Sequence, residues 1–327
     1  MTPISPHTRI TGIGSALMDI LINESDDFLK KFNKTKGGMT LVDDADIQKI
    51  LAGTGQTPLA VPGGAACNTI MGVGRLGGKA RFIGHRGNDE YGKNFEDQLV
   101  QSRVQPVLSA SNAPTGKVLS VITPDAQRSM FTFLGASTEF DPLAIKAEMF
   151  NETAIAMIEG YLLFNRDLMM AALKAAKEAG ALIALDLASF EVVNSSKDIL
   201  DNIIQDYVDI LIANEDEAKA FTGFSDEQKA VEALSENTSY AVLKVGERGS
   251  YVAHQQDIVK IPAQKGNSPV DTTGAGDLWA SGFLFGLAHG FSIEKSGRLA
   301  SACGYEVCQV MGAQIPETAW ERIRVST

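Results

Sequence analysis

A short glycine-rich segment near the last quarter of the chain carries the clearest chemical signal. Residues 270–277 read Val-Asp-Thr-Thr-Gly-Ala-Gly-Asp, and a long apolar stretch, residues 278–287, follows them. When an extended chain turns into a helix through small residues, backbone N–H groups stay bare at the positive end of the helix dipole. Asp277 lies in the same first turn and is the candidate general base. The sequence therefore predicts an anion hole formed by the amides of Gly274, Ala275 and Gly276.

An anion hole beside a carboxylate suits phosphoryl transfer. The amides would stabilise the charge of the transferring group, and the aspartate would accept the proton of an attacking hydroxyl. A carboxylate in the first turn of a helix can also serve only to complement the helix dipole. Three adjacent small residues cost helix stability, however, which favours the close approach of a ligand. The segment alone therefore favours a kinase.

A second glycine-rich segment precedes an earlier helix-like stretch. Pro62, Gly63 and Gly64 come first, and Asn68 follows in the first turn. Two glycines let a substrate approach the backbone, and an asparagine offers a donor and an acceptor to sugar hydroxyls. The alternative interpretation is an ordinary glycine-rich helix start.

Two other glycine patterns resemble nucleotide-binding motifs in the wrong context. Residues 72–77 spell GxGxxG, which a dinucleotide site needs directly after a strand, but here the pattern ends a helix-like stretch. Close packing and a helix C-terminus explain its glycines, so a dehydrogenase is disfavoured. Residues 87–94 approach a P-loop, but Asn94 replaces the hydroxyl that would bind Mg²⁺. A polar turn before a helix is the preferred interpretation.

The composition excludes several classes of protein. The 327 residues include 29 Lys and Arg against 40 Asp and Glu, a net charge of −11, which argues against nucleic acid as a partner. The three cysteines and four histidines lack metal-ligand spacing, and the cysteines indicate buried thiols in a reducing compartment. No apolar run reaches membrane-spanning length and no signal peptide is evident. We therefore expect a cytoplasmic protein without a membrane partner.

Alternating strand-like and helix-like stretches predict the fold that positions these residues. Strands are expected at residues 80–83, 154–158, 182–186, 210–213 and 241–245. Helices are expected at residues 65–76, 91–102, 167–178, 197–206, 215–221 and 226–234, and over most of the chain after Asp271. Such alternation predicts an α/β fold, with a central, mostly parallel sheet flanked by helices on both faces.

The early β-rich pieces do not follow this alternation. We expect one strand over residues 12–22, and a hairpin from residues 117–122 and 129–134. The simplest account is a small β-sheet lid assembled from about residues 10–22, 37–42 and 114–134. The lid would stand on one α/β catalytic domain that spans residues 1–327.

The two glycine-rich segments together resemble the signatures of the ribokinase/PfkB family of small-molecule kinases. Residues 271–283, DTTGAGDLWASGF, match the C-terminal signature, and residues 63–78, GGAACNTIMGVGRLGG, match the N-terminal one. The resemblance covers nearly the full chain. It implies a ribokinase-like fold, ATP as the phosphoryl donor, Mg²⁺, and K⁺ as a candidate further ion.

The resemblance also implies roles for individual residues. Asp277 would be the catalytic base, with Gly274, Ala275 and Gly276 as the anion hole. The acceptor would be bound by Asp19, Gly63, Gly64, Asn68, Arg128 and Tyr161. ATP would be bound by Asn214, Lys244, Gly246, Gly249 and Thr272. Glu217, in an NxxE pattern with Asn214, would arrange water around Mg²⁺. A monovalent cation would lie at Asp271, Thr273 and Gly312.

Finer similarities, in residues 114–116, 128–136 and 302–316, place the chain closest to the adenosine kinase branch. We therefore expect transfer to a primary hydroxyl, namely the 5′-hydroxyl of adenosine or another purine nucleoside. A purine base needs an apolar slot with an aromatic face. Residues available to line one are Leu17, Leu41, Phe133, Tyr161 and Phe164.

Other interpretations stay open at this point. The main alternative is a sugar kinase of the same family, acting on ribose, fructose or a 2-keto sugar acid. A non-catalytic nucleotide-binding sensor with the same fold is disfavoured by the intact Asp277 segment. The resemblance is compatible with a monomer, common among adenosine kinases, and with a homodimer through the lid, as in the ribokinase branch.

Overall fold

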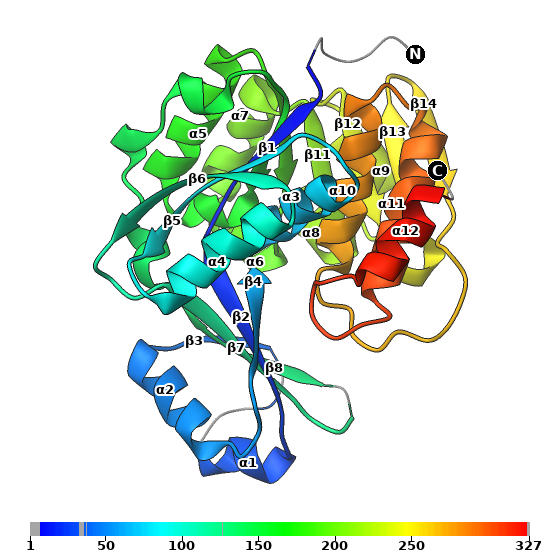
Figure 1. Ribbon diagram of the computed structural model, residues 1–327. Helices are drawn as coiled ribbons and strands as arrows, with labels where there is room; N and C mark the ends of the chain where they lie inside the picture. The colour runs from blue at the N-terminus through cyan, green and yellow to red at the C-terminus, as the bar shows by residue number, and fades with distance from the viewer. Residues whose placement is uncertain (1–6, 33–35, 37, 126, 326–327) are drawn as a thin grey trace.

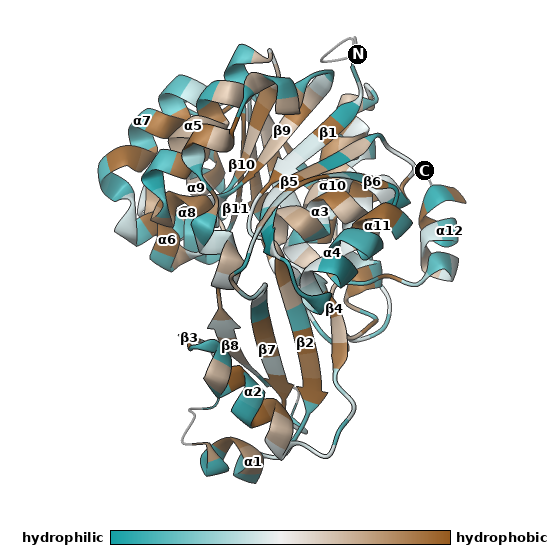
Figure 2. Ribbon diagram, turned by 60° about the vertical axis from the view of Figure 1, so that its left-hand side comes forward, coloured by the Kyte–Doolittle hydropathy of each residue, from teal (hydrophilic) through white to brown (hydrophobic). Residues whose placement is uncertain are grey.

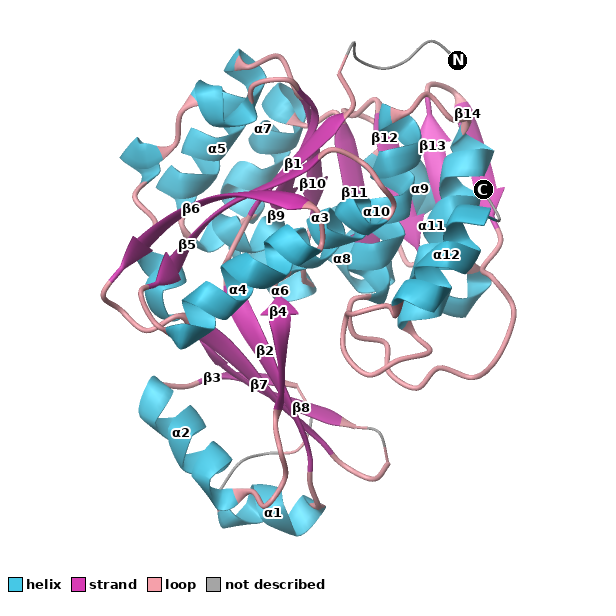
Figure 3. Cartoon of the chain, viewed as in Figure 1, coloured by secondary structure: helices cyan, strands magenta, loops and turns pink. Residues whose placement is uncertain are grey.

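Two β-sheets organise the chain (Figure 1), for which a computed structural model describes residues 7–32, 36, 38–125 and 127–325. Within these residues the large sheet has nine strands, in the order β14-β13-β12-β11-β10-β9-β1-β5-β6. The small sheet has five described strands, in the order β3-β8-β7-β2-β4. Figure 3 shows the small sheet at one end of the α/β body. The expected α/β fold with a second, small sheet is confirmed.

The large sheet runs parallel from β12 to β6 and is antiparallel only at the edge formed by β13 and β14. Every residue of the central strand β9 is buried, as expected when helices cover both faces of a parallel sheet. The strands are β1 (Arg9–Ile13), β5 (Ala80–Gly87), β6 (Val104–Ser111), β9 (Thr153–Glu159), β10 (Leu182–Asp186), β11 (Ile210–Asn214), β12 (Tyr240–Lys244), β13 (Ser250–His254) and β14 (Asp257–Ile261).

Helices pack on both faces of this sheet (Figure 1). One face carries α5 (Arg166–Glu178), α6 (Phe190–Ser195), α7 (Lys197–Tyr207), α8 (Glu215–Thr222) and α9 (Glu227–Leu234). The other carries α3 (Ala65–Arg75), α4 (Glu90–Gln101), α10 (Ala275–Ala288) and α11 (Ile293–Val307), with α12 (Glu317–Val325) against α11. None of the described helices combines the length and the apolar character needed to cross a bilayer.

The small sheet has two unlike faces, and Figure 2 shows the short helices α1 and α2 beside it. Alternate residues of its strands, such as Ile20, Leu119 and Phe131, pack against the short helices α1 and α2. The residues between them, such as Asp19, point to the opposite face. The elements are β2 (Leu17–Asn23), β3 (Met39–Leu41), β4 (Leu59–Gly63), β7 (Gly116–Ile122), β8 (Arg128–Phe133), α1 (Asp26–Lys31) and α2 (Asp44–Gly53).

The prediction of one strand over residues 12–22, within a lid segment that begins at residue 10, is wrong. β1 ends at Ile13 and lies in the large sheet between β9 and β5, whereas β2 begins the small sheet at Leu17. The chain leaves the large sheet at Gly14, where a Cβ atom would lie 2.5 Å from Oε2 of Glu159. The continuous apolar run conceals this break. Residue 37 of the second lid segment lies outside the described residues.

Four strands are not predicted from the sequence, namely β4, β6, β13 and β14. Two of them contain a proline, Pro62 in β4 and Pro106 in β6. Both strands lie at the edge of their sheets, where a missing N–H costs no ladder hydrogen bond. The expected hairpin is confirmed, because β7 and β8 pair antiparallel.

Candidate active site

Four neighbouring parallel strands end in a polar residue at the same edge of the large sheet. Glu159, Asp186, Asn214 and Lys244 are the last residues of β9, β10, β11 and β12. In open α/β sheets, ligands bind in the crevice at the carboxyl ends of the strands. Sequence reasoning missed Glu159 and Asp186. The signal that points to them is a single acidic residue closing an otherwise apolar strand.

The loop before α10 leaves backbone donors free. Gly274 caps the helix with φ +72°, a left-handed conformation that favours glycine, and a Cβ there would lie 2.7 Å from Cβ of Ala313. The Ala275 N–H donates to Thr272 O at 3.2 Å. This N–H, expected to be part of the anion hole, is therefore already hydrogen-bonded within the turn. Within the described chain, the N–H groups of Gly274, Gly276 and Asp277 meet no acceptor.

Asp277 joins the starts of α3 and α10. Asn68 Nδ2 donates to Asp277 Oδ2 at 2.9 Å, and the Thr69 hydroxyl donates to Asp277 O at 3.1 Å. Burial raises the pKa of Asp277 to about 6, against the opposing effect of the Asn68 hydrogen bond. The structure therefore brings together the two glycine-rich segments through their polar side chains.

Asp19 lies beside the glycine pair. Its carboxylate occupies the space that a Cβ on Gly63 would need. Gly64 has φ +93°, and a Cβ there would lie 2.7 Å from Ser15 O. Burial raises the pKa of Asp19 to about 7; Arg128 lowers that pKa and Asp277 raises it, which places both groups in its neighbourhood.

Glu159 holds the two chain segments that lead to and from the small sheet. Its Oε2 accepts from the Ala66 N–H at 3.1 Å, and its Oε1 accepts from the Ser15 N–H at 3.4 Å. The side chain is only 2% exposed, and burial raises its pKa to about 7. Glu159 thus fixes the backbone just before β2 and just after Gly64.

Asn214 and Glu217 form a reciprocal capping box at the start of α8. The Asn214 side-chain amide donates to Glu217 Oε1 at 2.6 Å, and the Glu217 N–H donates to Asn214 Oδ1 at 2.9 Å. Burial and the nearby Asp186 raise the pKa of Glu217 to about 7. Among the described residues, no three His, Cys, Asp or Glu side chains gather in a way that would hold a metal ion.

Asp271, Thr273 and Gly312 meet, as the sequence predicts. Asp271 Oδ1 accepts from the N–H and the hydroxyl of Thr273, at 3.0 and 2.7 Å, and Oδ2 accepts from the Gly312 N–H at 2.8 Å. Although burial opposes it, these hydrogen bonds hold the pKa of Asp271 below its ordinary value. Arg128, at the start of β8, donates to the Thr273 hydroxyl and so connects the small sheet to this loop.

Only part of the expected apolar slot lies near Asp19. Cross-strand partners place Asp19, Val118, Thr132 and Leu41 in one row on one face of the small sheet, and Leu41 is 64% exposed. Phe133 belongs to the opposite face, 6.0 Å from the Lys117 ammonium, so its assignment to the slot is wrong. The reason is the strand period of two, which turns neighbouring residues to opposite faces.

Two exposed aromatic rings follow β9. Tyr161 and Phe164 lie in the short 3₁₀ segment Gly160–Phe164, with ring centroids 6.5 Å apart. Burial, together with the carboxylates of Glu159 and Glu217, raises the pKa of Tyr161 to about 12. Because the carboxylates of Glu159 and Glu217 affect the pKa of Tyr161, its side chain lies near the carboxyl edge of the large sheet.

Of three further residues expected to bind ATP, Thr272 alone contacts this cluster, through its carbonyl oxygen, which accepts from the Ala275 N–H. Gly249 lies in the turn after β12, where a Cβ would collide with Ile261 O of β14, so backbone packing explains it. Around Gly246, a Cβ would meet no described atom within 4 Å, and Thr272 is exposed. The GxGxxG pattern and the segment that approaches a P-loop have the structural roles expected for them. Gly72 and Gly74 allow close packing of α3, and Asp89 caps α4.

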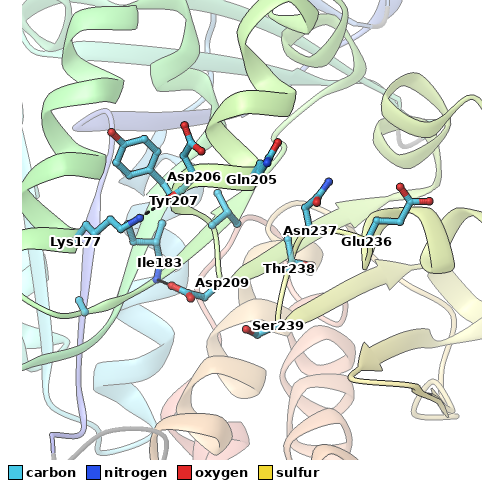
Figure 4. A pocket seen from close by; sticks show the side chains of 12 residues that line it. Lys177, Ile183, Gln205, Asp206, Tyr207, Asp209, Glu236, Asn237, Thr238 and Ser239 are labelled. Atoms are coloured by element: carbon cyan, nitrogen blue, oxygen red, sulfur yellow. Dashed lines mark hydrogen bonds between the residues drawn. The ribbon is translucent and has the colours of Figure 1, made fainter.

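A polar cavity of about 430 Å³ lies at the opposite, amino-terminal ends of β10, β11 and β12 (Figure 4). Its lining includes Lys177, Asp206, Asp209 and Glu236, and none of the residues expected from the sequence to bind a ligand. The site expected from the sequence is therefore separate from this cavity.

Comparison with known proteins identifies the family. Residues 38–320 match the pfkB family carbohydrate kinase model. The chain is 29% identical over 306 residues to "Probable fructokinase-7" of Arabidopsis thaliana, covering 85% of this chain and 84% of the relative. An adenosine kinase structure from Sinorhizobium meliloti superposes with a TM-score of 0.89 and 28% identity, covering 99% of this chain and 100% of that one. A probable sugar kinase from Rhizobium etli gives 0.88 and 28%, covering 97% and 98%.

Both the matched relatives and the matched structures are kinases, and they share the ribokinase-like α/β fold seen here. The match to the family model spans most of the chain and includes both glycine-rich segments. The chain therefore belongs to the pfkB family of carbohydrate kinases and is a phosphotransferase with an alcohol group as acceptor.

Proposed function

We propose that this enzyme transfers the γ-phosphoryl group of ATP to the 5′-hydroxyl of a purine nucleoside, with adenosine as the first candidate. The observation that carries the phosphoryl-transfer part is the contact of Asn68 with Asp277, at the start of a helix whose amides lack acceptors. A carboxylate with a raised pKa beside free N–H donors combines a base and an anion site within one helical turn.

The small sheet favours a nucleoside over a free sugar. Asp19 offers a carboxylate to hydroxyl groups, while Val118 and the exposed Leu41 continue the same row with apolar surface. A ribose bound at Asp19 would therefore have an apolar surface beside it on which a base can lie. Tyr161 and Phe164 add exposed aromatic rings at the carboxyl edge of the large sheet.

The mechanism assigns one task to each group. Asp277 accepts the proton of the attacking hydroxyl, and Asn68 fixes the orientation of the carboxylate. The amides of Gly274 and Gly276 stabilise the charge on the transferring group, together with the dipole of α10. Asp19, Gly63 and Gly64 hold the acceptor hydroxyls against the backbone.

ATP and Mg²⁺ fit the carboxyl edge of the sheet. Lys244 and the free amides suit phosphates, and Asn214 closes the edge between Asp186 and Lys244. Mg²⁺, when bound, would neutralise charge on the phosphates; Glu217 would order its water ligands, and a monovalent ion would lie at Asp271, Thr273 and Gly312. Because Arg128 reaches Thr273 from β8, the small sheet serves as a lid that closes on the acceptor and excludes water.

The first test is ADP release from Mg-ATP, with K⁺ present, across a panel of acceptors. The panel holds adenosine, inosine, guanosine, cytidine, ribose, fructose and 2-keto-3-deoxygluconate. We expect turnover with purine nucleosides. Turnover with a sugar alone would keep Asp277 as the base and replace the nucleoside assignment with a sugar kinase, consistent with the fructokinase relative.

The base assignment is tested by Asp277→Asn. This change removes the proton acceptor and keeps the shape and the Asn68 contact, so kcat should fall by about 10²–10⁴-fold while ATP still binds. Steady-state kinetics and calorimetric ATP binding measure the two effects. Asp198→Asn, in an exposed pair with Arg166, is the control and should leave kcat unchanged. A near-normal kcat for Asp277→Asn would show that another group is the base.

A further inference from the structure

A buried ion pair spans the carboxyl edge of the large sheet. Lys244 Nζ donates to Asp186 Oδ2 at 2.9 Å, across the end of β11, and the two side chains are 14% and 8% exposed. Asp186 Oδ1 accepts from the Ala188 N–H at 2.9 Å, so the carboxylate is fixed on its other side. The ammonium is thus held by a partner that itself has little freedom.

The Lys244 side chain lies beside the first turn of α10. A Cβ atom on Gly276 would lie 3.0 Å from Nζ of Lys244. The ammonium therefore lies near Gly276, in the turn where the N–H groups of Gly274, Gly276 and Asp277 meet no acceptor among the described residues. A cation at the positive end of a helix is electrostatically unfavourable by itself.

Three sources of positive potential therefore converge on one small volume: the ammonium, the free amides and the helix dipole. Although burial acts against the charged form, the carboxylates of Asp186 and Glu217 raise the pKa of Lys244, so the side chain stays protonated. An ammonium has three N–H donors, and Asp186 takes one. Among the described residues, no acceptor is recorded for the remaining donors or for these amides, and the oxygens of a phosphoryl group would suit them.

We propose that Lys244 contacts the transferring γ-phosphoryl group during the reaction and that Asp186 is the positioning residue which aims its ammonium. The inference rests on the proposed function and deepens it, because it moves Lys244 from general ATP binding to the reacting group. The bond between phosphorus and the β,γ-bridging oxygen breaks, a bond to the acceptor oxygen forms, and the hydroxyl proton passes to Asp277. Lys244 stays protonated and donates hydrogen bonds to the non-bridging oxygens throughout.

A purely structural pair would behave differently. Buried ion pairs contribute little net stability, and removing one partner leaves an uncompensated charge that destabilises the fold. A structural role therefore predicts a lower melting temperature and an equal loss of affinity for every nucleotide. A role at the γ-phosphoryl group predicts a loss that depends on the number of phosphates.

The first experiment measures nucleotide binding by the full-length enzyme without acceptor. The ligands are the Mg²⁺ complexes of ADP and of β,γ-imido-ATP, and the variants are Asp186→Asn and Lys244→Met, with melting temperatures recorded for each. We expect each variant to bind β,γ-imido-ATP at least about tenfold more weakly and ADP less than about threefold more weakly. Equal losses for both ligands would overturn the proposal, because Lys244 would then act on the phosphates shared by ADP and ATP.

The second experiment separates kcat from KM with the best acceptor of the panel. Asp186→Asn keeps the shape of the side chain and the acceptor for Ala188, so kcat should fall at least about tenfold with a small change in the acceptor KM. Asp186→Glu restores the carboxylate and should recover part of kcat, whereas Asp198→Asn again serves as the control. A kcat within twofold of the wild type for Asp186→Asn would contradict the positioning role.

The two proposals can fail separately. If the wild-type enzyme phosphorylates no acceptor in the panel, the proposed function fails. The comparison of ADP with β,γ-imido-ATP needs no acceptor, so it still decides whether Lys244 and Asp186 recognise the terminal phosphate.

Discussion

The surroundings of Asp277 determine how strong a base its carboxylate is. An ordinary aspartate is too weak a base to accept a proton efficiently near neutral pH, whereas burial raises the pKa of Asp277 to about 6. At pH 7 most of the carboxylate is still deprotonated and therefore competent. Asp19, with a pKa of about 7, titrates in a neighbouring range because burial acts on it in the same way.

The pH dependence of kcat/KM follows from these values. Protonation removes the base, so activity should fall as the pH decreases through about 6, with a second inflection near 7 from Asp19. The measurement is a profile of kcat/KM for the acceptor between pH 5 and 8.5. In Asp19→Asn the inflection near 7 should weaken, because only Glu159 and Glu217 then titrate in that range, and the lower one should persist. A flat profile down to pH 5 would contradict the assignment of Asp277.

Individual residues differ in how far the sequence reveals them. Asp277 and Asn68 lie in contiguous glycine-rich segments, and the resemblance of those segments to family signatures points to both. Glu159 and Asp186 belong to no such motif, because each is one acidic residue at the end of an apolar strand. Their partners, Ala66 and Lys244, are 93 and 58 residues away in the sequence, so only the folded chain shows what they hold.

At the scale of elements, the turn between β5 and α4 joins the body to the small sheet. Asp89 caps α4 by accepting from the Gly92 N–H at 2.8 Å, and it also accepts from the N–H and the hydroxyl of Thr115, just before β7. The Gly87 N–H donates to the same Thr115 hydroxyl at 3.1 Å. The segment that approaches a P-loop in sequence is therefore a junction between the two sheets.

Removing the hydrogen bonds of this junction should lower the free energy of unfolding more than removing a helix cap alone. Asp226 is a matched control, because it caps α9 through the Lys229 N–H alone. Asp226→Ala should destabilise the protein by about 1 kcal/mol, and Asp89→Ala by about 1–2 kcal/mol more, since two donors of Thr115 also lose their partner. Denaturant unfolding measures both. Equal losses would show that the Thr115 contacts contribute nothing.

The elements themselves are predictable where their periodicity is undisturbed. The buried parallel strands and their helices follow from alternating apolar patterns, whereas the edge strands β4 and β6 contain prolines that argue locally against a strand. The break at Gly14 cannot be seen in the sequence because apolar residues continue on both sides of it, and only the folded chain shows that Gly14 lies against Glu159.

Four acids with strongly raised pKa values lie at one site of the molecule. Burial raises the pKa values of Asp19, Glu159 and Glu217 to about 7, and of Asp277 to about 6. An acid with a raised pKa binds its proton more tightly in the folded state than in the unfolded chain. Folding stability must therefore increase as the pH falls from about 8 towards 5, before acids with lowered pKa values, such as Asp125, become protonated.

Thermal melting without nucleotide tests this expectation. The melting temperature should rise between pH 8 and pH 5.5, opposite to the usual behaviour of proteins whose carboxylates are paired. Glu159→Gln removes one of the responsible groups at the centre of the site and should make the slope shallower. A melting temperature that falls steadily over this range would show that the buried acids remain ionised in the folded protein.

The strand order of the small sheet constrains how the chain reaches its native state. β3 pairs with β8 and β2 pairs with β7, so the hairpin from the segment after β6 lies between two strands from the segment before α3. Neither segment can complete the sheet by itself, and Leu17 finds its partner Gly116 only after the intervening chain has been placed. Loop closure over such distances is slow. During synthesis, the acceptor side of the site thus assembles only once residue 133 has left the ribosome.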